Sequence, residues 1–286
     1  MEAIIKNRFR IVKLLGQGGM GDVFLAEDSK HGRQVAIKRI GADFIHAMDA
    51  ESHFRHGARA ASRLNHPNVC TIYEIVEENG SAFIIMQYVD GVTLDQLLKI
   101  KSLTLNQVID IALQIAAGLE AAQDRSIVHR DIKPGNIMID CSGQVKILDF
   151  GLAKICPGAI AKENKVCADP ELSDQGIIMG TASYMSPEQV KGLHTDGRTD
   201  IFSYGVVLYE MIENKNPFSA RENIVTLFNI LHSKVGFSRD VPKLLRAIVK
   251  KAMRKNRRYR YKDFSEIIKD LLALQKQLAK AANRPL

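Results

Sequence analysis

The spacing of apolar residues changes about a third of the way along the chain. Before Gly91, short apolar runs alternate with polar residues and are interrupted by glycines, as in FRIVKLLGQGGMGDVFLAED (9–28) and RQVAIKRI (33–40). This pattern predicts strands joined by tight turns. The run SAFIIMQYV (81–89) predicts a buried strand, and residues 46–64 predict one helix. We therefore expect a small β-rich lobe in the first ninety residues.

After Gly91, apolar residues recur at intervals of three and four, which predicts helices. The longest is LTLNQVIDIALQIAAGLEAAQ (103–123), and four more are predicted at 201–212, 227–235, 244–253 and 264–280. The fold class is therefore α+β, with the β-rich lobe followed by a larger α-rich lobe and the boundary near Met86–Gly91. The polar stretch 154–179 predicts an irregular loop, and a loop of that length in a compact domain is usually functional.

Composition limits the class of protein. The chain has 286 residues, of which 46% are apolar and 25% charged, which is enough for a sizeable core. No run of 18 apolar residues predicts a membrane span, and the start MEAIIKNRFR does not predict a signal peptide. The four cysteines are scattered without a C-x-x-C pair, so we expect reduced thiols in the cytoplasm rather than disulfides or zinc.

Positive charge is concentrated in one segment. The net charge is +8, and ten Lys and Arg residues but no acid lie between Lys243 and Lys262. Such a patch can meet nucleic acid, anionic lipid or an acidic partner, or it can be a solvated helix surface. No aromatic stacking platform or groove-reading motif accompanies it. The solvated surface is therefore favoured, and nucleic acid is not expected as a partner.

A glycine-rich turn is the first candidate for chemistry. In GQGGMGDV, Gly16, Gly18 and Gly21 would let backbone N–H groups approach phosphates closely. Glycine-rich hairpins are common, so the motif alone is weak evidence, and the strands on both sides of it argue against a dinucleotide-binding fold. On the next strand, Lys38 of VAIK can point at the same phosphates. Val23 and Ala36 would offer an apolar ceiling for a purine.

Two polar motifs in the second lobe provide the strongest signal. HRDIKPGN (129–136) places an acid, a lysine and an amide in one compact loop. Asp131 could accept a hydroxyl proton, Lys133 could neutralise a phosphoryl group and Asn136 could coordinate Mg²⁺. DFG (149–151) follows the strand-like QVKIL and supplies a second metal ligand, Asp149. Mg²⁺ usually takes one or two carboxylates together with phosphate oxygens, which fits these motifs better than an ordinary charged turn does.

With these motifs the chain resembles the eukaryotic-like protein kinase family, and within it the bacterial serine/threonine branch. The resemblance runs from about residue 9 to 272 and includes LNHPNV, DIFSYGVVLYEM and GTASYMSPEQ. It implies a bilobal fold with an N-lobe over 9–88, a C-lobe over 89–273 and a C-terminal helical tail over 274–286. It also implies a signalling enzyme that transfers the γ-phosphoryl group of ATP to serine or threonine hydroxyls of a protein substrate, using Mg²⁺.

The resemblance further implies a role for each matching residue. Asp131 would be the catalytic base, Lys133 would mark the serine/threonine class, and Thr181 would position the acceptor hydroxyl. The metal ligands would be Asn136 and Asp149. The predicted ATP-binding residues are Gly16, Gly18, Gly21, Val23, Ala36, Lys38, Gln87, Val89 and Met138, with Met86 as gatekeeper.

Supporting contacts follow from the same resemblance. Glu188, in SPE where the family usually has A-P-E, would form a buried ion pair with Arg260. Asp200 would anchor the backbone of the catalytic loop. At the hinge, Gln87 stands where relatives often carry Glu, and because the contact there uses backbone groups we expect little effect.

Regulation is predicted at two positions. Arg130 would pair with a phosphorylated residue of the following loop, which adds charge-assisted hydrogen bonds. Ser173 is the only hydroxyl between Gly151 and Gly180, so it is the candidate for autophosphorylation. Two alternatives stay open: Ser173 is an unmodified loop serine, or the acids near it stand in for the phosphate.

The main departure from the family lies at Gly57. The helix glutamate that pairs with the strand lysine falls on Gly57, whether residues are counted forward from Lys38 or back from HPN. The neighbours on the same helix face, His53, Phe54, Ala60 and Ala61, are not acidic. By analogy with loss of one preorganised electrostatic contact, this costs about 2–4 kcal/mol, or ~10²–10³ in rate.

Two functions follow from this departure. One is an active but impaired kinase, in which Lys38 is held by Asp149, by another carboxylate, or by an activating partner or dimer. The other is a nucleotide-binding pseudokinase that acts as a switch or scaffold. The intact HRDIKPGN and DFG motifs favour the enzyme. A small-molecule phosphotransferase is disfavoured, because Lys133, GTASY and SPE are features of kinases that act on proteins.

Overall fold

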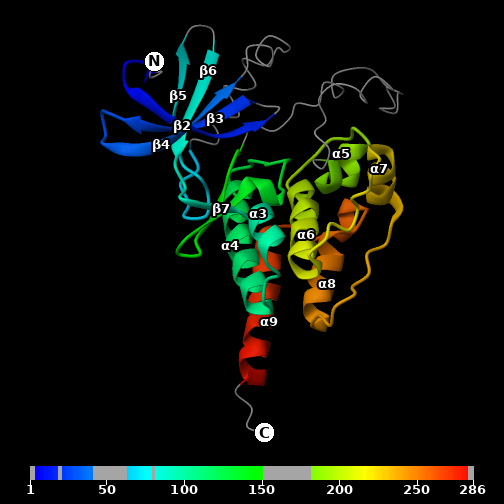
Figure 1. Ribbon diagram of the computed structural model, residues 1–286. Helices are drawn as coiled ribbons and strands as arrows, with labels where there is room; N and C mark the ends of the chain where they lie inside the picture. Colours follow the sequence, from blue (N-terminus) through cyan, green and yellow to red (C-terminus); the bar gives the residue numbers. More distant parts are fainter. Residues whose placement is uncertain (1–3, 19–20, 41–62, 79–80, 151–181, 283–286) are drawn as a thin grey trace.

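The computed structural model describes residues 4–18, 21–40, 63–78, 81–150 and 182–282, and it has two parts (Figure 1). The first part is a six-stranded antiparallel sheet in the order β1-β2-β3-β4-β6-β5. Its strands are β1 (Ile4–Ile5), β2 (Phe9–Gly18), β3 (Gly21–Asp28), β4 (Arg33–Ile40), β5 (Ile72–Glu78) and β6 (Ser81–Gln87). The predicted strands are confirmed, whereas the helix predicted over 46–64 lies almost entirely outside the described residues.

The sheet curls so that its two edges come together. Arg8 donates from Nε and Nη2 to the Asp28 carboxylate, at 2.7 Å each, and from Nη1 to Glu74 of β5 at 2.7 Å. The backbone N–H of Lys6 donates to Glu78 at the end of β5. Asp28 is buried, and the Arg8 guanidinium holds the pKa of its carboxyl well below the usual range. These bonds join the first strands to the last strand around an apolar cluster that includes Phe9 and Phe83.

The second part is helical, with a small three-stranded sheet at its upper end (Figure 1). Its helices are α3 (Leu94–Ile100), α4 (Leu105–Gln123), α5 (Pro187–Val190), α6 (Arg198–Glu213), α7 (Asn223–His232), α8 (Lys243–Ala252) and α9 (Phe264–Ala282). The small sheet has the order β7 (Gly91–Thr93), β8 (Ile137–Asp140), β9 (Val145–Ile147). The predicted fold class, a β-rich lobe followed by an α-rich lobe, is confirmed.

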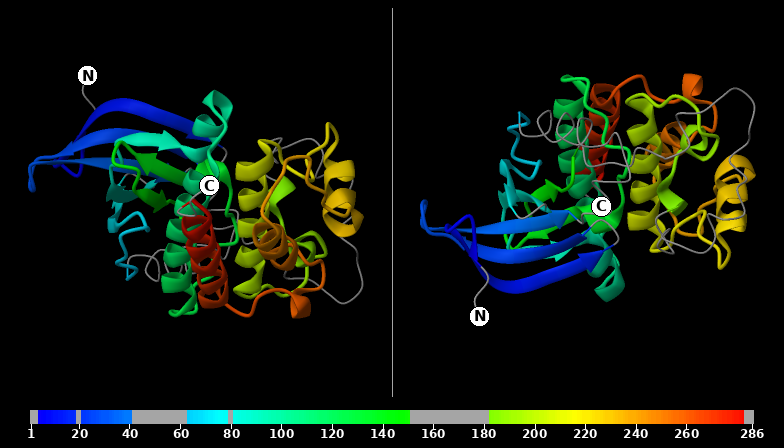
Figure 2. Two further views of the ribbon diagram at one scale, coloured as in Figure 1. Left: turned by 90° about the horizontal axis from the view of Figure 1, so that it is seen from below. Right: turned by 90° about the horizontal axis from the view of Figure 1, so that it is seen from above.

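The helical part is organised around α6. Nearly every residue of α6 is buried, including the polar Thr199, Asp200 and Ser203, so this helix runs through the core. Helix α4 packs on α6, and α9 lies along α4 (Figures 1 and 2). The apolar cluster that forms the core of the helical part extends upward to Ile40 and Ile84 of the six-stranded sheet. The core therefore joins the two lobes, and the site between them has a packed base.

Some details were not expected from the sequence. Helix α3 and strands β7 and β8 were not predicted, because their short segments show no clear periodicity, whereas β9 lies within the strand-like QVKIL. Helix α7 ends at His232, three residues before the end of the predicted segment. The division into residues 9–88, 89–273 and 274–286 stays a prediction. Its second boundary falls inside α9, which continues unbroken to Ala282.

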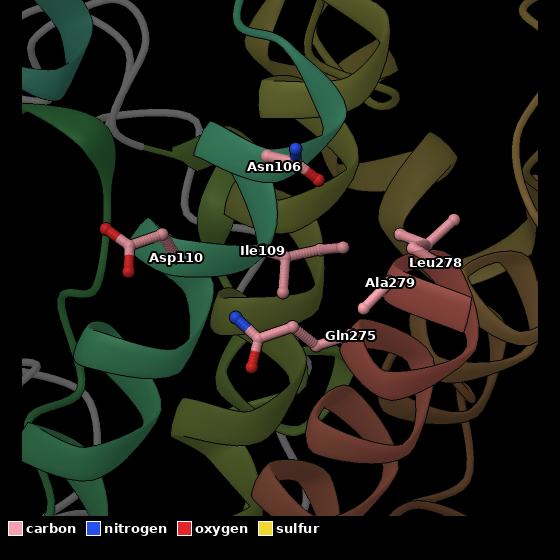
Figure 3. A pocket seen from close by; sticks show the side chains of 6 residues that line it. All are labelled: Asn106, Ile109, Asp110, Gln275, Leu278 and Ala279. Carbon is pink, nitrogen blue, oxygen red and sulfur yellow. The ribbon is translucent and has the colours of Figure 1, made fainter. Parts of the chain in front are cut away.

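A cavity of about 580 Å³ opens between α4 and α9, away from the predicted site. In Figure 3, Ile109 of α4 points toward Leu278 and Ala279 of α9, and the other lining residues are Asn106, Asp110 and Gln275. Among the described residues, no helix is long and apolar enough to cross a membrane.

Candidate active site

The glycine-rich hairpin forms the upper wall of the site. Strands β2 and β3 pair with Gly16 opposite Val23 and Gly18 opposite Gly21. Gly21 has φ +128°, and a Cβ there would lie 1.8 Å from the carbonyl oxygen of Arg39, so only glycine fits. At Gly16, by contrast, no described atom lies within 4 Å of where a Cβ would be. The local packing therefore does not require glycine at this position, which fits a role in leaving room for a ligand.

Lys38 lies on β4, opposite Val23 of β3 and Ile84 of β6. Its position in a central strand directs the side chain inward, and the side chain is only 6% exposed. Its Nζ donates to Asp149 Oδ2 at 2.8 Å. One of the arrangements considered for Lys38, an ion pair with Asp149, is therefore present in this structure. The pair links the N-lobe sheet directly to the C-lobe.

A small apolar cluster lies beside this ion pair. Its buried members come from β4, from the segment before β5, from the end of β6 and from the segment just after β6. Its partly buried members come from β3, from β8 and from the residue after β9. They are Ala36, Cys70, Met86, Val89, Val23, Met138 and Leu148. All of the apolar residues predicted for the purine pocket are in this cluster. Residues from both lobes thus form one apolar cluster beside Lys38 and Asp149.

Cys70 and Leu148 belong to this cluster but were not predicted from the sequence. The Cys70 thiol donates to the carbonyl oxygen of Gln87 at 3.5 Å, and the N–H of Gln87 donates to the carbonyl of Thr71. Burial, with the nearby Asp149 charge, raises the pKa of the Cys70 thiol to about 12. The thiol therefore stays protonated and acts as an apolar wall residue. A lone cysteine without a motif gave no signal for this position.

The backbone of the catalytic loop is held from below by α6. Asp200 accepts from the N–H of His129 and of Arg130, at 2.7 Å each, which confirms the anchoring that the resemblance implied. The buried His129 ring donates from Nε2 to the carbonyl of Leu148 at 2.8 Å and accepts at Nδ1 from the N–H of Asp131. These bonds assign the proton of the imidazole to Nε2. Arg130 has φ +65°, an unfavourable conformation for a non-glycine residue that the surrounding bonds stabilise.

The Asp131 carboxylate is oriented by its neighbours in the same loop. Lys133 Nζ donates to Asp131 Oδ2 at 2.8 Å, and Asn136 Nδ2 donates to the same oxygen at 3.0 Å and to the Asp131 carbonyl at 2.8 Å. Among the described residues, Oδ1 of Asp131 has no hydrogen-bond partner. One carboxylate oxygen is thus fixed while the other is left available to a substrate hydroxyl.

The two predicted metal ligands come together through the backbone. The N–H of Leu148 donates to the carbonyl of Asn136 at 2.8 Å, which brings the residue before Asp149 against the catalytic loop. Asp149 has φ +60°, a second strained non-glycine residue in this site. Among the described residues, no group of three or more His, Cys, Asp or Glu side chains could hold a metal ion. A site here would therefore consist of one carboxylate, one amide oxygen and ligand oxygens, a donor set that suits Mg²⁺.

The large-lobe ion pair is also confirmed. Arg260 donates to both oxygens of Glu188, at 2.6 and 2.7 Å, and both side chains are buried. Burial opposes ionisation of Glu188, but Arg260 outweighs it and keeps the pKa of the carboxyl below its ordinary value. Three predicted site residues, Gly57, Ser173 and Thr181, lie outside the described residues.

A glycine hairpin and strand lysine above an Asp–Lys–Asn loop, with an apolar cluster between two lobes, are typical of phosphotransferases that bind a nucleotide. Residues 9–278 match the model of the protein kinase domain, and the chain belongs to this family. Members of the family use ATP and a divalent metal ion.

The chain is similar to curated bacterial serine/threonine-protein kinases. It is 35% identical over 279 residues to a probable serine/threonine-protein kinase of Clostridium perfringens, covering 96% of this chain and 39% of the relative. It is 32% identical over 272 residues to the kinase PrkC of Bacillus subtilis, covering 93% and 40%. It is 34% identical over 265 residues to PknA of Mycobacterium tuberculosis, covering 90% and 59%. The chain thus spans between two fifths and three fifths of the length of these relatives.

Proposed function

We propose that this chain is a serine/threonine protein kinase that transfers the γ-phosphoryl group of ATP to hydroxyls of a protein substrate. The observation that carries the proposal is the orientation of Asp131. Lys133 and Asn136 both donate to Oδ2, and Oδ1 has no partner among the described residues. A base that must receive a hydroxyl proton needs one fixed and one accessible oxygen, because geometry decides proton transfer before pKa does.

The remaining residues would bind and orient ATP. The apolar cluster around Ala36 and Met138 would contact the base, with backbone groups of Gln87 and Val89 at its edge. Lys38 would hold phosphate oxygens beneath the glycine hairpin. Lys133, which is 2.8 Å from Asp131, would also balance charge on the transferred phosphoryl group.

Asn136 and Asp149 would hold Mg²⁺. Because Asn136 Nδ2 faces Asp131, the amide oxygen of Asn136 is turned away from that carboxylate and can serve as a metal donor. A bound Mg²⁺ neutralises charge on the phosphate oxygens. Asp149 now accepts from Lys38, so this ion pair must open or share its oxygens when ATP binds with the metal.

The same ion pair favours a second candidate function, a nucleotide-binding pseudokinase. Lys38 and Asp149 neutralise each other at 2.8 Å, and Gly57 provides no carboxylate to compete for the lysine. A chain held in this state would bind a nucleotide as a switch or scaffold. The oriented Asp131, Lys133 and Asn136 favour the enzyme, because a scaffold has no chemical need for them.

Several features of the proposal concern regulation. Arg130, whose side chain is exposed, would receive a phosphate on Ser173, and Thr181 would contact the acceptor hydroxyl. An activating partner or dimer would compensate for Gly57. The protein substrate and a cytoplasmic location belong to the same proposal.

The kinase function is tested by comparing four proteins: the wild type, Gly57→Glu, Asp131→Asn and Asp240→Asn. Asp240 is an exposed loop residue before α8, so its variant is a matched control for the Asp131 change. Binding of Mg·ATP is measured by calorimetry, and transfer to a generic basic protein is measured with labelled ATP. Asp131→Asn should reduce transfer by roughly 10²–10⁴ without loss of binding, because only proton acceptance is removed. Gly57→Glu should raise transfer by roughly 10²–10³.

The outcomes separate the two functions. Wild-type transfer above the Asp131→Asn level, with Asp240→Asn equal to wild type, supports the enzyme. Binding of Mg·ATP without transfer above the Asp131→Asn level would reject the enzyme in favour of the pseudokinase. Loss of binding in all four proteins would reject both functions.

A further inference from the structure

Gln189, in the short helix α5, connects two segments that are distant in sequence. Its Oε1 accepts from the backbone N–H of Ser186 at 2.9 Å, and its own N–H donates to Ser186 Oγ at 3.3 Å, which is a capping box. Its Nε2 donates to the carbonyl oxygen of Arg130 at 2.9 Å. Both ends of the Gln189 amide are therefore engaged, the oxygen within α5 and the nitrogen on the catalytic loop.

The Arg130 carbonyl belongs to the peptide group that leads into Asp131. The N–H of that peptide donates to His129 Nδ1 at 3.2 Å, and its C=O accepts from Gln189. Because a peptide group is planar, fixing its oxygen and its N–H on opposite sides fixes the plane and the direction in which the Asp131 Cα leaves it. Lys133 then holds the carboxylate.

The strain at Arg130 makes this bond more important. Arg130 has φ +65°, and its N–H is held by Asp200 of α6 at 2.7 Å. A left-handed conformation at a non-glycine residue persists only where its neighbours hold it on both sides. Asp200 holds the side before Arg130, and Gln189 holds the side after it.

Helix α5 is itself rigidly attached to the core. Glu188, next to Gln189, bonds to Arg260 and to Thr199 Oγ1 of α6, and Ser186 is fully buried. The position of α5 can therefore be transmitted to the catalytic loop through a single side chain.

We propose that Gln189 is a positioning residue that fixes the Arg130–Asp131 peptide and so couples the orientation of the Asp131 carboxylate to the segment 182–190. This inference rests on the proposed function, in which Asp131 is the base. It requires a side chain at position 189 that accepts from Ser186 and donates to a carbonyl at the same time, which an amide does and an ionised carboxylate cannot do.

The test is Gln189→Glu, which has nearly the same shape. A carboxylate still accepts from the Ser186 N–H but cannot donate to the Arg130 carbonyl, so the capping box remains and the link to the loop is replaced by repulsion. The matched control is Gln107→Glu in α4, which changes an identical capping box around Thr104 at an exposed position. Asp131→Asn provides the background for transfer.

At pH 8, Gln189→Glu should lower kcat by roughly 10- to 100-fold, as expected for a misplaced catalytic group, with KM for ATP within twofold of wild type. Its thermal midpoint should stay close to that of Gln107→Glu. A kcat equal to that of Gln107→Glu would contradict the positioning role.

Hydrogen exchange distinguishes failure of this inference from failure of the proposed function. Exchange of the Asp131 amide, which donates to His129, should be faster in Gln189→Glu than in wild type and unchanged in Gln107→Glu. If the wild type transfers phosphate and Gln189→Glu matches it in kcat and exchange, the positioning role is overturned and the kinase function stands. If the wild type is inactive, the kinase function fails, and unchanged Asp131 exchange in Gln189→Glu overturns the positioning role as well.

Discussion

Replacing Arg260 by Met tests how the large lobe is held together. The guanidinium donates to both Glu188 oxygens, at 2.6 and 2.7 Å, and to three backbone carbonyls, those of Arg198, Arg254 and Lys255, at 2.7 to 3.1 Å. In Arg260→Met, the Glu188 carboxylate, whose residue is only 4% exposed, keeps one described side-chain donor, the Thr199 hydroxyl. Breaking a buried ion pair in this way costs about 3–5 kcal/mol.

The free energy of unfolding that Arg260→Met removes should decrease as the pH falls. In the folded wild type, the pKa of Glu188 is lowered. The ionised carboxylate therefore contributes its full stabilisation above the pKa of an unfolded Glu, about 4.3, and this stabilisation is lost as the pH falls through the pKa of the folded protein. Without Arg260, burial raises the pKa above the unfolded value, and the variant then gains stability as pH falls through that raised value. The difference between the two proteins should therefore shrink from pH 7.5 to pH 4.5.

Urea unfolding followed by circular dichroism at both pH values measures this difference. Arg258→Met, at an exposed residue in the same short helical turn, is the matched control and should change the free energy of unfolding by less than about 0.5 kcal/mol. The double variant Glu188→Gln/Arg260→Met should recover part of the loss, since it removes the unpaired charge. A cost below about 1 kcal/mol, or one that is the same at both pH values, would refute the reasoning.

Three further predictions concern other parts of the structure. Gly91→Ala places a Cβ 2.2 Å from a backbone carbonyl oxygen of β8, so this variant should lower the free energy of unfolding in urea by about 1–3 kcal/mol. Gly236→Ala is the control and should be nearly neutral, because no described atom lies within 4 Å of its Cβ position. Iodoacetamide at pH 8 should label the exposed Cys141 and spare the buried Cys70, as read by peptide mass, because the pKa of Cys70 is about 12; equal labelling would contradict its burial. Burial, and to a smaller extent a nearby arginine, lower the pKa of Lys255 to about 8. Between pH 8 and 10 the wild type should therefore gain stability relative to Lys255→Met. A difference in the free energy of unfolding that stays constant over this range would exclude the lowered pKa.

Much of the fold could be predicted from local patterns. The apolar run in β4 and the spacing of three and four in α4 and α9 were sufficient. Helices α4 and α9 each bury one stripe, and β4 buries four consecutive residues in the centre of its sheet. The pattern failed for α3 and for strands β7 and β8, where elements of three to seven residues are too short to show a period. These elements form because tertiary neighbours support them, as the close approach of Gly91 to Ile139 shows.

Part of the candidate site could likewise be predicted from the sequence, and part of it could not. Motifs located Lys38, Asp131, Asn136 and Asp149, since the chemistry of phosphate and Mg²⁺ needs those residue types at those spacings. No motif identified Cys70 as a member of the apolar cluster, because an isolated apolar residue carries no signal until the strands are assembled.

The sequence by itself determined the family, the two-lobed order of strands and helices, and which side chains can perform chemistry. The absence of the family's helix glutamate at Gly57 stays a prediction from a count of residues, because position 57 lies outside the described residues. The tertiary structure alone decided which partners those side chains take. Lys38 pairs with Asp149 across 111 positions of the chain, and Gln189 reaches the Arg130 carbonyl across 59. Such contacts depend on how elements pack in space, and no local pattern specifies a hydrogen bond between residues so far apart.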